Sequence, residues 1–143
     1  MLVKLLPEQI PKHWKTIQLS ITEAAPPFVK LTEDTFSNNL KALLIGEMEC
    51  WIVCKDDGKP VGIMLTTFTN DFCFGTKSLL LYSLWTIGGT SRKIWLDGWE
   101  TIKKYAVGSN CQLIISYSNS PPIIEMAKMT GAEAEMTFLK WEV

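Results

Sequence analysis

Residues 79–95 read LLLYSLWTIGGTSRKIW: an apolar run, two adjacent glycines, a small polar pair and the start of a helical pattern. The apolar run has the length of a buried strand, and the glycines mark its end. Beyond them, apolar residues recur at helical spacing. This stretch therefore predicts a strand over residues 78–87, a turn at Gly88 and Gly89, and a helix over residues 91–107.

The turn itself allows two interpretations. A plain strand-to-helix connection needs flexible residues and a cap, and Thr90 or Ser91 would serve as the cap. The first N–H groups of a helix also lack partners, and the helix dipole is positive there, so the same turn could hold a phosphate. Arg92 would add positive charge. The residues alone leave both interpretations open and favour the plain turn.

The flanking sequence predicts helices and further strands. Apolar residues at helical spacing predict helices over residues 11–25 and from the cap candidate Thr32 to Gly46. Two apolar runs enclose Asp56-Asp57-Gly58-Lys59, and an Asp-Gly step in that setting is typical of a β-hairpin. The remaining expected elements are strands at residues 49–55 and 60–67, a turn at 70–75, a strand at 112–117, a helix at 121–129 and a last strand at 136–143.

This order of elements predicts a single domain over residues 1–143 in the α/β (α+β) class. We expect a mixed, mostly antiparallel central sheet of about six strands with helices on its faces. A chain of 143 residues, 47% of them hydrophobic, is long enough to bury one core. The net charge is −1 and no apolar run reaches the length of a membrane span. We therefore expect a soluble, cytoplasmic protein that binds neither nucleic acid nor membrane.

The cysteines and the histidine limit the chemistry that the chain can perform. Cys50, Cys54, Cys73 and Cys111 show no paired CxxC spacing, and we expect them to be buried free thiols. His13 is the only histidine, so a site with two histidine ligands is excluded. We expect no metal.

Three segments carry a resemblance to a known superfamily. They are the DDGKPVG hairpin at residues 56–62, the strand that runs into the glycine turn, and NSPPIIEMAKMTGA at residues 119–132. With them, nearly the whole chain resembles the GNAT acetyltransferases. The segment GEMECW at residues 46–51 is similar to the short GNAT-like proteins of tailed bacteriophages and prophages.

The resemblance implies acetyl-CoA as the cofactor. In the superfamily, acetyl-CoA lies between two strands that separate, and the loop before the next helix holds its pyrophosphate. The superfamily's spaced glycines and its leading arginine or glutamine are absent from the loop in this sequence. By position, the implied cofactor-binding residues are Trp85, Thr86, Ile87, Gly88, Gly89, Thr90, Ser91 and Arg92, together with Asn119.

The resemblance also implies acid and base residues. Superfamily enzymes use a tyrosine on the late helix to protonate the leaving thiolate, and a carboxylate to accept the amine proton. Alignment on Gly131 places Ala127 at the tyrosine position, so Tyr117 is the nearest substitute. No carboxylate stands at the usual base position, but Glu47 and Glu49 could face the site, and Glu49 is the candidate base. An ordinary strand aromatic and a solvated rim charge are the alternative interpretations of Tyr117 and Glu49.

Two functions are consistent with these features. The first is transfer of an acetyl group from acetyl-CoA to an amine of a small molecule or a protein, mainly by positioning the reactants. The alternative is a catalytically inactive GNAT-fold binding protein of phage or prophage origin, which the missing glycines and tyrosine favour. The N-terminal helix pair would either close over a substrate or pair with a second subunit in a homodimer.

Overall fold

A computed structural model describes residues 1–26, 29–88, 91–134 and 139–141 of the chain. These residues form a five-stranded sheet with the strands in sequence order. The strands are β1 (Leu2–Lys4), β2 (Glu49–Cys54), β3 (Pro60–Asp71), β4 (Thr76–Thr86) and β5 (Leu113–Ser116). The helices are α1 (Ile10–Ala24), α2 (Glu33–Ile45), α3 (Arg92–Gly108) and α4 (Pro121–Met129), and the 3₁₀ helix η1 (Pro7–Gln9) precedes α1.

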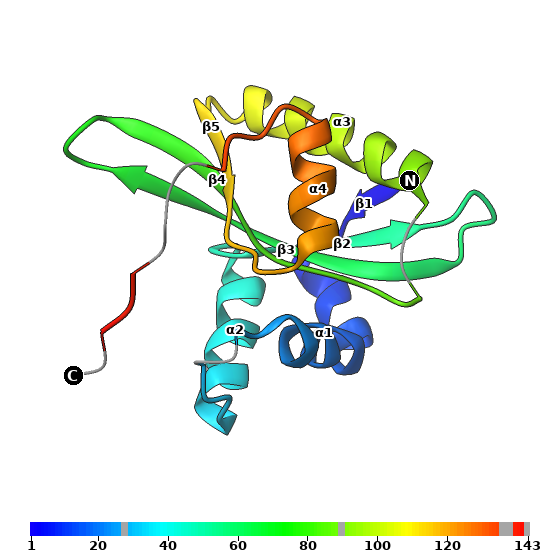
Figure 1. The fold of residues 1–143 in the computed structure, drawn as a ribbon. Coiled ribbons are helices and arrows are strands. Elements are labelled where there is room, and N and C mark those ends of the chain that lie inside the picture. Colours follow the sequence, from blue (N-terminus) through cyan, green and yellow to red (C-terminus); the bar gives the residue numbers. More distant parts are fainter. Residues whose placement is uncertain (27–28, 89–90, 135–138, 142–143) are drawn as a thin grey trace.

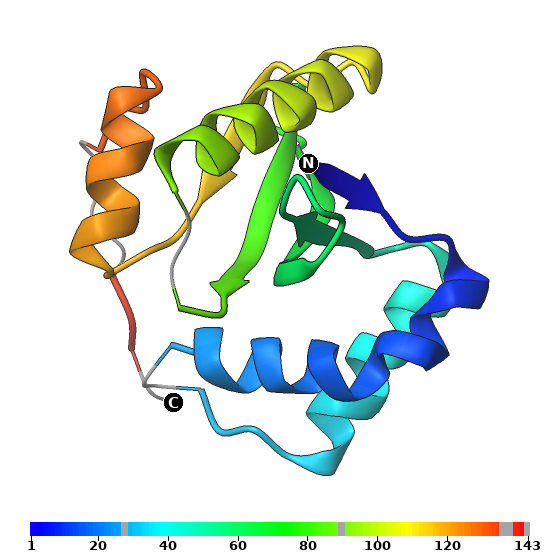
Figure 2. The same cartoon turned by 90° about the vertical axis from the view of Figure 1, so that its right-hand side faces the viewer.

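The sheet is mixed, as the element order predicts. Strands β1 to β4 pair antiparallel with their neighbours, and β4 pairs parallel with β5. Helices α1 and α2 cover one face and α3 covers the other, while α4 lies beside the β5 edge (Figures 1 and 2). In the described part of the chain, no helix is long and apolar enough to cross a lipid bilayer.

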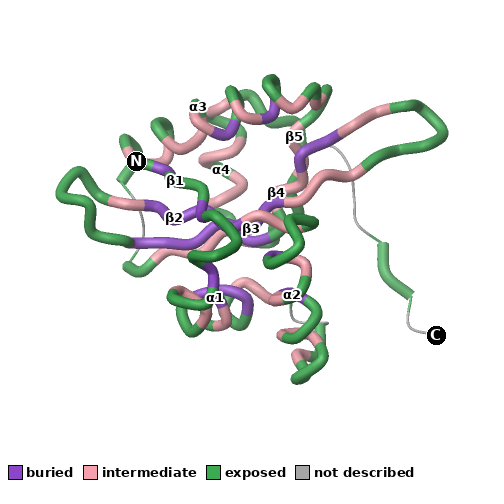
Figure 3. Tube along the Cα trace, turned by 180° about the vertical axis from the view of Figure 1, so that it is seen from behind, coloured by how far each residue is buried: buried purple, intermediate pink, exposed green. Residues whose placement is uncertain are grey.

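Each face of the sheet has its own hydrophobic core. Ile17 of α1 and Leu65 of β3 are fully buried on the first face. Leu79 of β4 and Ile102 of α3 are buried on the second. Figure 3 shows that the buried residues follow the middle of the sheet, where helices cover both faces. Burial of apolar surface on both faces is the main stabilising contribution to such a layered fold.

Local sequence signals place the helix ends correctly. Thr32 caps α2: its hydroxyl accepts a hydrogen bond from the Thr35 N–H at 3.2 Å, and the Thr35 hydroxyl accepts one from the Thr32 N–H. Gly46 ends the same helix with a φ of 78°, a conformation that favours glycine. Of the two cap candidates before α3, Ser91 is the residue whose side chain accepts the hydrogen bond.

The two ends of the chain differ from expectation. The first ordered element was expected at residue 11, but Leu2–Lys4 already pairs with β2 as strand β1. Three residues are too few for a periodic pattern, so the sequence carries no signal for this strand. The expected last strand at residues 136–143 falls largely outside the described residues. Leu139 and Trp141 are described, and both are exposed.

The β3–β4 hairpin extends beyond the rest of the sheet (Figure 1). At its tip, Asp71 Oδ1 accepts hydrogen bonds from the N–H groups of Cys73 and Phe74 at 2.9 and 3.1 Å. Cys73 is exposed, so the expectation of four buried thiols is wrong at this position, because the turn carries it away from the core. Cys50 is buried, and Cys54 and Cys111 are partly buried.

Candidate functional site

Strands β4 and β5 separate halfway along β4. Their pairing runs from Ser78 opposite Leu113 to Leu81 opposite Ser116 and ends there. At the same level the β3–β4 register shifts, because Leu65 lies opposite Ser83 and Thr66 opposite Leu81. Tyr82 is therefore an extra residue in β4, a β-bulge. Beyond it, β4 continues to Thr86 with no partner on its β5 side among the described residues.

The unpaired part of β4 presents backbone hydrogen-bonding groups. The Ile87 N–H donates to the Val61 carbonyl oxygen at 2.8 Å and thus points toward β3. Successive residues of a strand direct their backbone groups to opposite edges, so Thr86 and Leu84 direct theirs to the open edge. An extended, amide-containing ligand can pair with such an edge as an added strand would.

The open edge leads directly to the beginning of α3. Ser91 accepts from the Ile94 N–H at 3.3 Å through its side chain and from the Trp95 N–H at 3.1 Å through its carbonyl oxygen. The N–H groups of Arg92 and Lys93 thus have no partner among the described residues. In a helix of 17 residues, these groups and the dipole favour an anion at this end.

The structure places most of the expected cofactor-binding residues together. Thr86, Ile87 and Gly88 follow one another at the end of β4, and Gly88 has a φ of 68° with open space where a Cβ would be. Arg92 is exposed in the first turn of α3. Gly89 and Thr90 lie outside the described residues. Trp85 has its side chain on the other face, against the core under α1.

Tyr117 and Asn119 lie on the opposite side of the opening. Tyr117 directly follows Ser116, the last residue of β5 that pairs with β4, and it is exposed. It therefore flanks the separation from one strand as Tyr82 does from the other. Asn119 is exposed in the segment that leads to α4. The bulge at Tyr82 could not be predicted from the sequence, because a register shift between strands leaves no local sequence signal.

Glu49 belongs to a hydrogen-bonded cluster beneath α3. Its Oε1 lies 2.9 Å from Lys4 Nζ and accepts a hydrogen bond from the Tyr105 hydroxyl. Its Oε2 accepts from Thr66 Oγ1 at 3.1 Å, and Thr66 Oγ1 accepts from Trp51 Nε1 at 3.0 Å. The Glu49 side chain is only 14% exposed. This arrangement ties β1, β2, β3 and α3 together, and the role of Glu49 as a base stays a prediction.

The cluster shifts the pKa values of two of its members. Burial raises the pKa of Tyr105, and the hydrogen bond to Glu49 raises it further, whereas Lys4 acts in the opposite direction. Burial by itself would lower the pKa of Lys4, but its hydrogen bonds to Glu49 and Tyr105 outweigh this effect and raise it. At neutral pH, Lys4 therefore carries its charge and Tyr105 keeps its proton.

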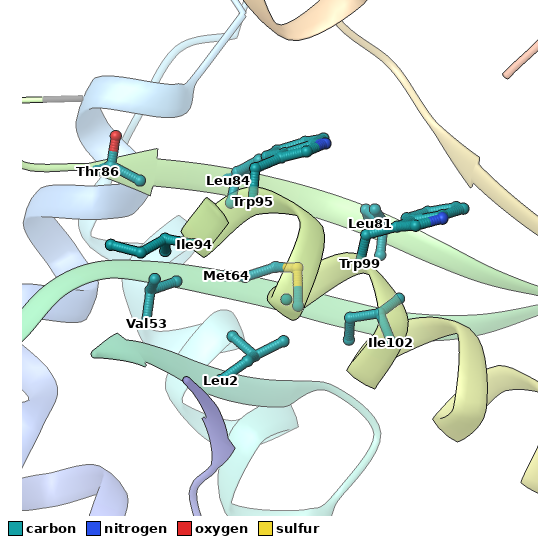
Figure 4. A pocket seen from close by; sticks show the side chains of 11 residues that line it. Leu2, Val53, Met64, Leu81, Leu84, Thr86, Ile94, Trp95, Trp99 and Ile102 are labelled. Atoms are coloured by element: carbon teal, nitrogen blue, oxygen red, sulfur yellow. The ribbon is translucent and has the colours of Figure 1, made fainter. Parts of the chain in front are cut away.

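A small cavity of about 50 Å³ lies between α3 and the sheet (Figure 4). It is lined mostly by apolar side chains, and the rings of Trp95 and Trp99 project from α3 in the same direction along β4. Among the described residues, Trp95 Nε1 has no hydrogen-bond partner. An apolar cavity of this kind stays dry. We interpret it as imperfect helix packing and not as a ligand site.

An open recess of about 530 Å³ lies between the β2–β3 turn and the start of α3. Lys93 Nζ lies 3.5 Å from Asp56 Oδ1 of the turn and 3.1 Å from Asp97 Oδ2 of α3. The hydrogen bond to Asp97 and the charges of both carboxylates raise the pKa of Lys93. Lys55, Asp56 and Asp57 also line this recess, so its two positive and two negative charges balance.

In the part of the chain that the structure describes, no group of three or more His, Cys, Asp or Glu residues could hold a metal ion.

Ser83 follows the bulge directly and is buried, and its hydroxyl has no hydrogen-bond partner among the described residues. A buried hydroxyl without a partner is costly unless water or a ligand satisfies it.

The sequence matches no protein-family model and no curated protein sequence. The structure, in contrast, is similar to solved acetyltransferases over its whole length. Ribosomal-protein-alanine N-acetyltransferase from Brucella melitensis biovar Abortus 2308 is 10% identical with a TM-score of 0.71, and the match covers 100% of this chain and 99% of that chain.

Two similar structures were solved with the cofactor. Aminoglycoside N-acetyltransferase AAC(6')-Iy in complex with CoA is 12% identical with a TM-score of 0.73, and the match covers 100% of this chain and 93% of that chain. A predicted acetyltransferase with acetyl-CoA from Clostridium acetobutylicum is 14% identical with a TM-score of 0.72, covering 99% and 95%. At these identities the likeness establishes the fold alone: the chain has the fold of the GNAT acetyltransferases.

Proposed function

We propose that this chain binds acetyl-CoA beside the end of β4 and transfers the acetyl group to an amine. The observation that carries the proposal is the bulge at Tyr82, after which β4 has an open edge that leads straight to the N-terminus of α3. Structures of the same fold contain CoA or acetyl-CoA. The bulge, the open edge and the helix end occur together, and this supports a binding site for a long ligand with an anionic end.

The described residues fit such a ligand at two places. Leu84 and Thr86 would bind the amide groups of the pantetheine arm through their open backbone groups. The free N–H groups of Arg92 and Lys93 would bind the pyrophosphate, and Gly88 leaves room for it because no side chain fills the space. The Arg92 guanidinium would add a positive charge near the phosphates.

Acetyl-CoA would supply an activated thioester whose acetyl carbon an amine can attack. The chain's own contribution is to hold both reactants at the point where β4 and β5 separate. Tyr117, which flanks this point, would donate its hydroxyl proton to the leaving sulfur. A water bound to the Ser83 hydroxyl, on the α1 side of β4, would take the proton that the amine loses and pass it to solvent. These roles need no carboxylate at the separation, which agrees with the position of Glu49 in the cluster beneath α3.

The acceptor is proposed to be an amine of a small molecule or a protein. Proteins of similar structure include an aminoglycoside N-acetyltransferase and a ribosomal-protein-alanine N-acetyltransferase. We place the activity in the cytoplasm, which would be the host cytoplasm if the resemblance of residues 46–51 to phage proteins reflects a phage origin.

Calorimetric titration with acetyl-CoA and with CoA tests the proposal. The wild-type chain should bind both in the micromolar range, and Gly88→Asp should weaken binding by about tenfold or more through charge repulsion. Gly88→Asn is the matched control, since asparagine tolerates the same positive φ without the charge. Gly46→Asp makes the same change at another positive-φ glycine with open space, at the end of α2.

Transfer is tested separately by measuring the release of free thiol from acetyl-CoA with a panel of amines. Thiol release that depends on both the amine and the protein supports an enzyme. No heat and no thermal stabilisation at millimolar acetyl-CoA would contradict the proposal and favour the catalytically inactive binding protein.

A further inference from the structure

The outer half of the β3–β4 hairpin has a free strand edge. β3 pairs with β4 as far as Asp71, but its pairing with β2 ends at Thr66, opposite Glu49. Beyond Thr66, no described residue pairs with this edge. Because β2 and β3 are bonded through Thr66, every second residue from there, Phe68 and Asn70, directs its N–H and C=O to the free edge.

The far end of this edge carries two exposed phenylalanines. Phe72 is 96% exposed and Phe74 is 84% exposed. The hydrogen bonds that the Cys73 and Phe74 N–H groups donate to Asp71 Oδ1 hold this conformation. Figure 3 shows the whole tip as exposed chain, away from both cores. Two large apolar side chains at one protruding turn are typical of an interaction surface and not of a solvated loop.

The near end of the edge carries a second apolar patch. Leu44 and Ile45, the last two residues of α2, are 43% and 57% exposed. The segment after α2 is fixed beside the hairpin, because Thr67 Oγ1 donates to the Glu47 carbonyl oxygen at 2.8 Å. The free edge therefore has a pair of aromatic side chains at one end and an aliphatic pair at the other.

The charged residues near the free edge indicate which kinds of partner could bind to it. Between Thr67 and Gly75 there is no lysine, arginine or proline, the residues that commonly protect a strand edge. Lys77 donates to the Ser109 carbonyl oxygen at 2.8 Å, with its ammonium 4.4 Å from the Phe68 ring, and so points back onto the molecule. Without basic residues at the tip, an anionic lipid surface is disfavoured. Two copies of this edge would bring the exposed Asp71 of one near the exposed Glu47 of the other, a surface repulsion that salt screens.

We propose that a second copy of this chain binds here, with the two β3 edges antiparallel about a two-fold axis. An antiparallel arrangement places the far end of one edge beside the near end of the other. Phe72 and Phe74 of each copy then pack on Leu44 and Ile45 of the other. The backbone groups of Phe68 and Asn70 pair between the copies, and the two sheets become continuous across the interface.

Sedimentation and light scattering over a range of concentrations test the interface. The wild-type chain should form a dimer. Phe72→Ser combined with Phe74→Ser, and separately Ile45→Lys, should each weaken the dimer about tenfold or more. Leu19→Ser is the control, because Leu19 is an exposed apolar residue on α1 outside the interface. Circular dichroism establishes that each variant is folded, which is expected since all of these side chains are exposed.

Cross-linking tests the antiparallel arrangement itself. The exposed Cys73 sits between the two phenylalanines and would lie near Ile45 of the second copy. A short bis-maleimide should link Ile45→Cys into a covalent dimer through the native Cys73, and Ile45→Cys with Cys73→Ser should give none. A monomer at all concentrations, a dimer insensitive to these substitutions, or a Cys73–Cys73 link in the wild-type chain would overturn the proposal. Acetyl-CoA binding lies at the other end of β4, so it can fail or succeed independently.

Discussion

The hydroxyl of Tyr105 donates a hydrogen bond to the carboxylate of Glu49, joining α3 to the first residue of β2 across 56 positions of sequence. Tyr105 also packs edge-on against Trp51, with ring centroids 4.9 Å apart. The relationship fixes the C-terminal half of α3 on the sheet. It thereby holds the helix whose other end forms part of the proposed cofactor site.

Tyr105→Phe should lower the free energy of unfolding by about 1–2 kcal/mol, because a largely buried carboxylate loses one of its donors. Urea denaturation measures the change. Tyr82→Phe is the control, since Tyr82 is 53% exposed and its hydroxyl is not among the groups that bond to Glu49. An equal loss in both variants would show that the Glu49 hydrogen bond contributes nothing specific.

The cluster also predicts a loss of stability at alkaline pH. The folded-state pKa values of Tyr105 and Lys4 lie above their ordinary values of 10.0 and 10.5. A group that binds its proton more tightly when folded adds stability below its unfolded pKa and loses that contribution as the pH rises through the folded pKa.

The melting temperature should be measured from about pH 8 to about pH 11. In the wild-type chain it should fall above about pH 10. The fall should be smaller in Tyr105→Phe combined with Lys4→Met. Identical pH profiles for the two proteins would exclude the cluster as the cause.

Two glycines should respond oppositely to alanine. A Cβ on Gly62 would lie 2.6 Å from the Trp85 carbonyl oxygen and 2.9 Å from Thr86 Cγ2. Gly62→Ala should therefore destabilise the fold by about 1–3 kcal/mol. Gly98 lies within α3 with nothing within 4 Å of its Cβ position, and it borders the small cavity. Gly98→Ala should stabilise by about 0.5–1 kcal/mol. Thermal denaturation of both variants checks the signs, and a stable Gly62→Ala would contradict the close approach of β3 and β4.

If the chain transfers acetyl groups, Tyr117→Phe should lower kcat about 10- to 100-fold and leave the KM for acetyl-CoA nearly unchanged. Loss of the proton donor slows departure of the thiolate without removing a binding contact. Steady-state thiol release measures both constants. Tyr82→Phe changes the tyrosine on the facing strand and is the control for a general effect on the opening. A Tyr117→Phe enzyme with wild-type kcat would remove Tyr117 from the acid role.

Much of the fold could be predicted from the sequence because its signals are local. The Asp57-Gly58 step marks the first hairpin, Thr32 and Ser91 cap helices, and Gly46 ends one. In each of these cases, residues within four positions of one another decide the backbone conformation. The order of elements then limits the architecture to few alternatives.

The parts that could not be predicted depend on contacts between distant segments. Lys4 and Glu49 are 45 positions apart, and Lys4 and Tyr105 are 101 apart, so no local pattern reveals the cluster. The bulge at Tyr82 depends on how β3 and β4 align. The exposure of Cys73 depends on how far the second hairpin extends, because an apolar run looks the same in a core and at a protruding tip.

The bulge also decides which face of the sheet each residue at the end of β4 occupies. Before it, Leu79 and Leu81 face α3; after it, Leu84 and Thr86 face α3 while Ser83 and Trp85 face α1. If the same residues alternated strictly without the bulge, the last part of the strand would be inside out, with the Thr86 hydroxyl under α1 and the Trp85 ring under α3. Deleting Tyr82 would keep these faces and remove only the bulge, whereas one residue inserted after Tyr82 would exchange them.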